Sequence, residues 1–350
     1  MSYRSMRCRV VVALAAAFSA LIPAAAQAMH AANTLPASKE WTPSSVSFSL
    51  EPSIGLLEGT ADEYVFDYPS GRKFKLSELN WDLKNVAMAG LQAGIGFGGR
   101  FRVNIGYWSA LTEGDGRMVD RDWAYRSYFD AGLIDPNNIG DGDWTHRSVH
   151  PDTTLDNGSL FDLNLSFVPL KYGPFALSII QGYKRNQWKW SARGGTAVYT
   201  PLMDPNTADL AQFRSHLVDF TPGVRIISYE QEYSIPYIGL GATLAGASYV
   251  LESHVLLSNA VMATDRDYHD ERSVLFEGDF SGGHYVGIGL SATWAFARHW
   301  TARLGVEYQV ISEIVGDVTI SGAEGRWFDE SGGGIAMNAT MYSLGAGYRF

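Results

Sequence analysis

Apolar and polar residues alternate along most of this chain. Segments 100–108, 159–170, 284–296 and 301–310 each place apolar residues at every second position, with polar residues or glycine between them. A period of two indicates β-strands whose two faces meet different surroundings. Each apolar face is close to the length that crosses a bilayer as a tilted strand, and outside the N-terminal region no apolar run reaches the length of a membrane helix. The pattern predicts an all-β protein that spans a membrane as an antiparallel barrel.

The opposite faces of the same strands carry charges and glycines. These residues suit a polar lumen better than the packed core of a β-sandwich. Aromatic residues make up 13% of the chain and often stand near the predicted strand ends, as in the aromatic girdles of membrane proteins. The glycine-rich stretch 94–99 lies within strand alternation and has no helix signal after it, so it does not indicate a nucleotide-binding loop.

The connections between the predicted strands differ in length. Short turns such as 296–300 alternate with long polar stretches. Outer-membrane barrels have long loops on the outer side and short turns on the other. We therefore expect four long outer connections, at 111–158, 194–226, 263–283 and 312–337.

The N-terminal segment predicts export. Residues 1–28 have a positive start, an apolar Ala-rich stretch and the small-x-small pattern Ala26-Gln27-Ala28, which together indicate a cleaved signal peptide. We expect 29–350 to form a single barrel domain. The last residues, 342–350, alternate and end in the aromatic Phe350, as many outer-membrane barrels do.

Composition narrows the possible chemistry. The single cysteine, Cys8, lies in the predicted signal peptide, so the mature chain offers no disulfide, thiol nucleophile or cysteine metal site. Removal of the signal peptide lowers Lys+Arg from 27 to 24 against 37 Asp+Glu, and the net charge falls from -10 to -13. An exported acidic protein is a poor candidate for nucleic-acid binding and a plausible binder of cations.

Two copies of Asp-Arg-Asp lie in or beside the long polar stretches. On a strand, Asp120 and Asp122 share one face, and Asp265, Asp267 and His269 share another. Asp-x-Asp in an acidic loop is more often a solvated surface or a weak calcium site than a catalytic one. The histidine in the second copy adds a base that titrates near neutral pH.

The order of motifs resembles the omptins, outer-membrane endopeptidases of Gram-negative bacteria. The resemblance runs from about Trp41 to Phe350 and rests on "MVDRDW" at 118–123, "HPDT" at 150–153 and Asp-x-Asp-x-His at 265–269. It implies a ten-stranded barrel that extends above the outer membrane, with the active site in a cleft facing the exterior. It also implies that Asp120 and Asp122 face an Asp267–His269 pair across that cleft.

The chemistry of these four residues fits peptide hydrolysis. A histidine can take a proton from water, and Asp267 can fix its tautomer and stabilise the imidazolium. Two close carboxylates rarely both stay ionised, so one of Asp120 and Asp122 is expected to keep a proton. The mechanism invokes no serine, cysteine, metal or organic cofactor.

The resemblance also implies a pocket for a basic residue before the scissile bond, formed by Glu63 and Asp265. Glu63 has the lumen-facing parity of its strand. Asp265, Asp267 and His269 do not: counted from the apolar positions of 249–257, they would face lipid in an unbroken strand. Either a bulge between Leu257 and Asp265 corrects the parity, or the rule relaxes above the membrane.

The chain also departs from the family. Where some members have acids, it has His146 and Arg147, so we expect neutral or small residues to be tolerated after the bond and basic ones disfavoured. Some members need lipopolysaccharide, bound through basic residues on the barrel wall. The matching segment here is "GYKRNQW". It predicts that activation by lipopolysaccharide is weaker or uses Lys184, Arg185 and Lys189.

Two classes of function remain open. The first is an outer-membrane endopeptidase that cuts cationic peptides or exposed protein loops after Arg or Lys. The second is a non-catalytic barrel that acts as an adhesin or binding protein. A porin is disfavoured, because side chains fill the lumen of a ten-stranded barrel.

Overall fold

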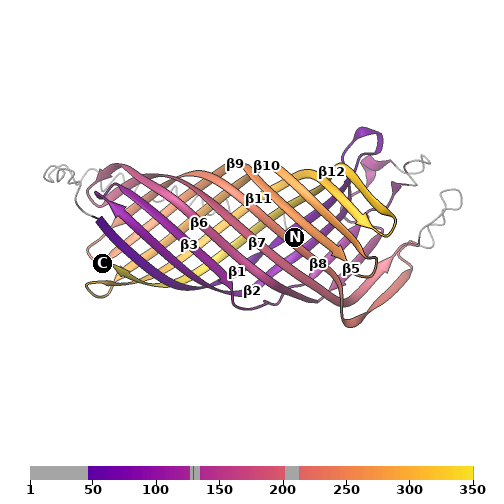
Figure 1. The fold of residues 1–350 in the computed structure, drawn as a ribbon, viewed down its shortest axis with the longest axis horizontal. Helices are drawn as coiled ribbons and strands as arrows, with labels where there is room; N and C mark the ends of the chain where they lie inside the picture. The colour runs from indigo at the N-terminus through magenta and orange to yellow at the C-terminus, as the bar shows by residue number, and fades with distance from the viewer. Residues whose placement is uncertain (1–45, 127–128, 130–134, 202–212, 350) are drawn as a thin grey trace.

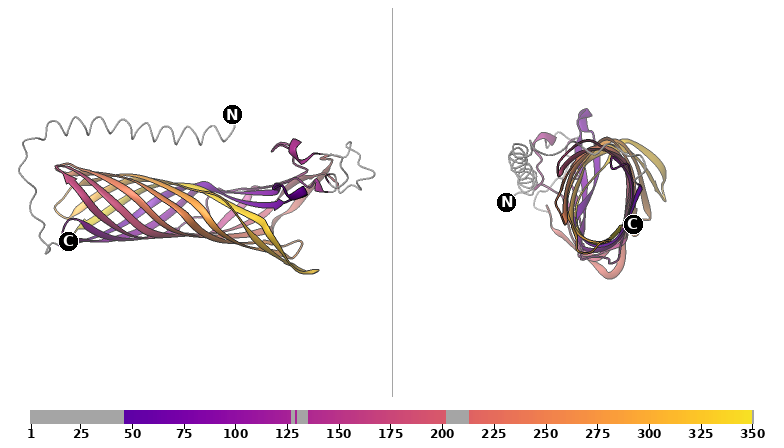
Figure 2. Two further views of the ribbon diagram at one scale, coloured as in Figure 1. Left: turned by 90° about the horizontal axis from the view of Figure 1, so that it is seen from above. Right: turned by 90° about the vertical axis from the view of Figure 1, so that its left-hand side faces the viewer.

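The protein is described from a computed structural model that covers residues 46–349, except 127–128, 130–134 and 202–212. The predicted signal peptide and Phe350 lie outside the described residues. One antiparallel sheet winds around an axis and closes on itself (Figure 1). Seen along that axis, the strands form a ring (Figure 2). The strands are β1 (Val46–Asp67), β2 (Phe74–Phe97), β3 (Phe101–Ala110), β4 (Met118–Asp122), β5 (His146–His150), β6 (Asp152–Tyr172), β7 (Phe175–Tyr199), β8 (His216–Ala245), β9 (Tyr249–His269), β10 (Val274–Ala295), β11 (Trp300–Gly322) and β12 (Gly325–Arg349).

These strands fill ten positions in the ring. β3 and β4 both pair with β2, and β5 and β6 both pair with β7, so each of these two couples is one interrupted strand. The ring closes where β1 pairs with β12 on one side and with β2 on the other. The predicted ten-stranded antiparallel barrel is confirmed.

An apolar belt surrounds the lower barrel, at the end with the short turns. Its side chains point outward and remain largely exposed: the exposed fraction is 65% for Ile238 and 67% for Leu240. Trp294 and Trp300 are also exposed, beside the turn that joins β10 to β11. Such an outer surface would favour aggregation in water but matches the lipid-facing band of a membrane barrel. Among the described residues, no helix is both long and apolar enough to cross a membrane.

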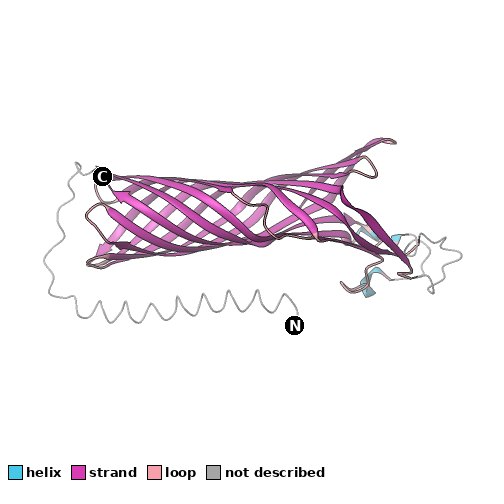
Figure 3. Ribbon diagram, turned by 90° about the horizontal axis from the view of Figure 1, so that it is seen from below, coloured by secondary structure: helices cyan, strands magenta, loops and turns pink. Residues whose placement is uncertain are grey.

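Above the belt, the strands continue further than we expected. Stretches 263–283 and 312–337, predicted as long connections, are mostly β9, β10, β11 and β12. Figure 3 shows strands running out to one end of the molecule, and Figure 1 shows these four among them in orange and yellow. The prediction was wrong because a strand above the membrane has no lipid-facing side, which weakens the alternation without ending the strand. Long connections do lie between β4 and β5 and between β7 and β8.

Two layers of side chains fill the lumen. In the lower layer, Lys184 bonds Asp162 at 2.7 Å and Glu307 at 2.8 Å, beside a polar cavity of about 540 Å³. Above it, Trp81, Trp190 and Tyr229 pack with ring centroids 5.2–5.9 Å apart and are almost fully buried. This aromatic layer closes the lumen beneath the upper end of the barrel.

Candidate active site

The upper part of β9 turns its acidic motif inward because the strand contains a bulge. Between Leu257 and Met262, β9 advances five positions while β8 advances four. The buried positions accordingly change from Leu256 to the odd-numbered series that includes Asp265 and Asp267. The bulge predicted between Leu257 and Asp265 is therefore present, and the parity conflict disappears.

Asp267 and His269 form a hydrogen-bonded pair. His269 Nε2 lies 2.6 Å from Asp267 Oδ2, and the other carboxylate oxygen of Asp267 is buried with no hydrogen-bond partner among the described residues. His269 Nδ1 lies 2.6 Å from the guanidinium of Arg272. A guanidinium can only donate, so Nδ1 accepts and the ring proton belongs to Nε2. The imidazole is thus neutral and donates to Asp267.

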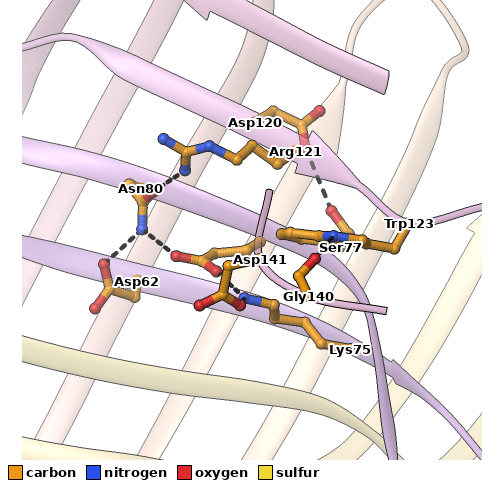
Figure 4. Close-up of polar contacts among 10 residues, drawn as sticks. Asp62, Lys75, Ser77, Asn80, Asp120, Arg121, Trp123, Gly140 and Asp141 are labelled. Carbon is orange, nitrogen blue, oxygen red and sulfur yellow. Dashed lines mark hydrogen bonds and ion pairs between the residues drawn. The ribbon is translucent and has the colours of Figure 1, made fainter. Parts of the chain in front are cut away.

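Asp120 and Asp122 project from β4 towards the same interior. The hydroxyl of Ser77, on the neighbouring strand β2, donates to Asp120 Oδ1 at 3.3 Å (Figure 4). Arg121, between the two aspartates, points to the other side of β4 and donates to Asn80 Oδ1 at 2.6 Å. Alternation along this short strand therefore places both carboxylates inside and the arginine outside.

Glu63 and Asp265 lie deeper, next to the aromatic layer. Their exposed fractions are 5% and 7%. Asp265 accepts from the hydroxyl of Tyr229 at 3.1 Å and from the backbone N–H of Gly278 at 3.0 Å. Glu63 Oε2 is buried without a hydrogen-bond partner in the described part of the chain. The pair forms an acidic recess below the Asp267–His269 pair.

The electrostatics show that the acids share one site. Burial raises the pKa of Glu63 well above its usual value, and Asp267, Asp265 and Asp120 raise it further. Burial and the charges of Asp122 and Asp267 likewise raise the pKa of Asp120. Because these acids lie on β1, β4 and β9, the three strands bring their side chains close together inside the barrel.

The pKa values of Asp122 and Asp265 rise as well. Burial is the main cause for Asp122, and it brings the pKa of Asp265 to about 7. The site contains five carboxylates, those of Glu63, Asp120, Asp122, Asp265 and Asp267. Within the described residues, no lysine or arginine forms an ion pair with any of them. The recess is therefore suited to receive a cation from outside and tends to hold protons until one arrives.

The structure brings together all six residues singled out in the sequence and adds three more. Ser77 and Tyr229 hold two of the carboxylates, and Arg272 contacts the histidine. The sequence carried no signal for these three, because a serine, a tyrosine and an arginine are common on strands and turns. Pairing between strands places Ser77 and Tyr229 beside their partners, and the turn after β9 brings Arg272 back to His269. Among the described residues, no group of three or more His, Asp or Glu side chains is arranged to hold a metal ion.

Arg147 and Lys184 do not lie where we expected. Arg147 pairs with Arg121 across β4 and β5, so it lies on the outer face of the wall, whereas His146 pairs with Asp122. Lys184 points into the lumen, where it bonds Asp162 and Glu307, and is not available to a lipid on the barrel wall. Both corrections follow from strand geometry, since adjacent residues face opposite sides.

Comparison with known proteins gives the family. The family model described as "Omptin family" matches residues 44–350. The chain belongs to the omptin family. A plasminogen activator of Yersinia pestis is 29% identical over 309 residues, which cover 87% of this chain and 90% of that protein. The outer membrane protease OmpP of Escherichia coli (strain K12) is 24% identical over 302 residues, covering 86% and 89%.

The fold comparison agrees with the family. The crystal structure of the outer membrane protease OmpT from Escherichia coli has a TM-score of 0.77 to this barrel and 23% sequence identity, covering 89% of this chain and 99% of that one. This omptin is therefore an outer-membrane β-barrel protease.

Proposed function

We propose that this omptin is an endopeptidase that cuts peptide bonds after Arg or Lys, with water activated by His269. The observation that carries the proposal is a neutral histidine hydrogen-bonded to a buried aspartate, placed above a recess of acids without a cation. The recess of Glu63 and Asp265 supplies specificity for a basic residue, and the Asp267–His269 pair supplies the base. The substrates are cationic peptides or exposed loops of proteins at the cell surface.

Recognition of the basic residue depends on Glu63 and Asp265. A guanidinium or ammonium group entering the recess can pair with both carboxylates and fill the hydrogen-bonding capacity that Glu63 Oε2 leaves unused. An apolar side chain would leave two buried acids without a cation, at a cost of several kcal/mol. Binding of the cation also favours the ionised form of both acids, so their protons are released when substrate binds.

Hydrolysis then uses the Asp267–His269 pair and the Asp120–Asp122 pair in different roles. His269 Nδ1 takes a proton from water, and Asp267 stabilises the imidazolium that results. Asp120 and Asp122 hold the water and the tetrahedral intermediate, and the one that keeps its proton hydrogen-bonds the developing oxyanion. The deprotonated water adds to the carbonyl carbon, and the C–N bond breaks as the protonated His269 returns its proton to the leaving amine. No step requires a cofactor.

A peptide assay tests the proposal. Refolded protein is incubated with a peptide containing a single Arg, with and without lipopolysaccharide, and the products are identified by mass spectrometry. We expect one cut, after the Arg, and at least a thousandfold loss of kcat/KM in His269→Ala and Asp120→Ala. His284→Ala is the matched control, because His284 is exposed on β10 outside the site. Near-wild-type turnover in His269→Ala would sink the mechanism, and the absence of any cut in the wild type would favour a binding protein.

The lipopolysaccharide arm tests a separate expectation. Three basic residues, Lys184, Arg185 and Lys189, were predicted to bind lipopolysaccharide. Because Lys184 points into the lumen, Arg185 and Lys189 remain to bind a phosphate group. Arg185 is already paired with Glu232 at 2.7 Å. We therefore propose that lipopolysaccharide stimulates this enzyme only weakly. A dependence of more than a hundredfold would contradict this.

A further inference from the structure

Arg272 lies in a short turn that is fixed to the barrel. The turn, Asp270–Ser273, joins β9 to β10. Its first residue, Asp270, accepts two hydrogen bonds from Arg225 on β8, at 2.7 and 2.8 Å, and its backbone N–H bonds the carbonyl of Ile226 at 2.9 Å. Anchored in this way, the turn holds Arg272 at the upper end of the barrel, here called the rim.

The side chain of Arg272 reaches back into the catalytic residues. Its guanidinium lies 2.6 Å from His269 Nδ1, the nitrogen that has to accept a proton from water. Burial raises the pKa of Asp120 and of Asp122, which project from β4 on the other side of the site, and the charge of Arg272 partly opposes this rise. The guanidinium is thus close to the Asp267–His269 pair and to the Asp120–Asp122 pair. In the free protein it covers the base, His269 Nδ1.

Arg272 lies on the side of the site that would face the substrate residues after the scissile bond. Along β9, Asp265 lies deepest, Asp267 and His269 follow towards the rim, and Arg272 comes next in the turn. A substrate whose basic side chain enters the recess at Asp265 has its scissile bond at the level of His269. The chain after the bond leaves towards the rim, where Arg272 lies.

We infer that Arg272 is a specificity-determining residue for the position directly after the scissile bond. Substrate displaces its guanidinium from His269. An acidic residue after the bond draws the guanidinium away, whereas a basic residue there repels it and competes for the same space. This inference rests on the proposed function, because it takes the basic side chain before the bond to occupy the recess. The sequence suggested that Arg147 disfavours a basic residue after the bond. Because Arg147 faces outward, the inference assigns this role to Arg272.

Three peptides and two variants test the inference. The peptides share one sequence with a single cleavable Arg and carry Ala, Asp or Lys directly after it. Arg272→Gln removes the charge and keeps a polar side chain. Arg266→Gln is the matched control, since Arg266 is an exposed arginine of β9 that pairs with Glu277 at 3.2 Å on the outer face.

The wild type should cut the Asp peptide fastest and the Lys peptide slowest. In Arg272→Gln, the ratio of kcat/KM for the Lys peptide to that for the Ala peptide should rise roughly tenfold, the size expected for two like charges about 8 Å apart in a partly wet cleft. Arg266→Gln should leave the ratio unchanged. An unchanged ratio in Arg272→Gln, or an equal loss for all three peptides, would overturn the inference and leave Arg272 as a residue that only positions the imidazole.

A second measurement does not depend on turnover. Nitrogen-15 NMR of histidine-labelled protein reports which ring nitrogen of His269 carries the proton and whether the other one accepts a hydrogen bond. The Nδ1 signal of His269 should move in Arg272→Gln, because the guanidinium that donates to Nδ1 has been removed. If the Nδ1 signal is the same in Arg272→Gln and the wild type, the contact does not exist in solution and the inference fails. A wild type that cuts after residues other than Arg or Lys would instead overturn the proposed function.

Discussion

Replacement of Asp265 by Asn should change the stability of the barrel in opposite directions at low and high pH. Asp265 is almost fully buried, accepts from Tyr229 and Gly278, and has no cation beside it in the described residues. Burial raises its pKa from 3.8 to about 7. Between these two values the folded protein keeps a proton that the unfolded chain has lost, so the free energy of unfolding falls as the pH rises.

The size of the effect follows from the shift. A shift from 3.8 to about 7 corresponds to about 4 kcal/mol of destabilisation once the pH exceeds the folded value. Asn cannot ionise and avoids this cost. Its amide NH₂ can stand where Asp265 accepts from the Tyr229 hydroxyl, which already accepts from Gln231 at 2.6 Å, so the hydroxyl proton loses its acceptor at a cost of about 1 kcal/mol. Asp265→Asn should therefore be about 1 kcal/mol less stable at pH 4 and about 3 kcal/mol more stable at pH 8.

Urea unfolding in detergent micelles, followed by tryptophan fluorescence and by mobility on unheated gels, measures this difference. Asp152→Asn is the control, because Asp152 is exposed at the start of β6 and lies outside the recess. If the difference between Asp265→Asn and the wild type is the same at pH 4 and pH 8, Asp265 does not titrate differently in the folded state. The account of the recess as a holder of protons would then be wrong.

Four further predictions concern the lumen, the pH profile, metals and processing. Lys184→Met should lower the free energy of unfolding by about 1–3 kcal/mol in urea, because it removes the cation shared by two half-buried carboxylates, Asp162 and Glu307, whereas Lys189→Met, which loses only an exposed 4.0 Å pair, should cost less than about 1 kcal/mol. For the single-Arg peptide, KM should rise as the pH falls from 8 to 5, since Asp265, with a pKa of about 7, must lose its proton before it pairs with the substrate cation; a flat KM would contradict this. Activity should survive a strong chelator, and complete loss that is restored by a divalent metal would refute the metal-free mechanism. Mass spectrometry of the outer-membrane protein should place the mature N-terminus near Met29, and detection of residues 4–26 in it would refute cleavage.

Local patterns in the sequence predicted the barrel correctly because membrane-facing strands record their surroundings at every second residue. Lipid on one side and a polar lumen on the other impose the alternation, and the alternation locates the lower strands. The same reasoning failed for 263–283 and 312–337, where β9 to β12 continue into water. There no face meets lipid, and the inner face mixes acids with apolar residues such as Phe280 and Ile314, so the local pattern cannot separate a strand from a loop.

The sequence by itself determined the class of fold, the membrane-facing residues and the six acidic and histidine positions of the candidate site. The order of motifs was enough to name those positions, but not to place them. Tertiary structure decided which way they point: the bulge in β9 turns Asp265, Asp267 and His269 inward, and pairing across β4 and β5 turns Arg147 outward. It also decided that Arg272 covers the base and that Lys184 joins the lumen network. The reason is physical, because one inserted residue reverses every side chain beyond it, and contacts between strands far apart in the chain leave no trace in either strand alone.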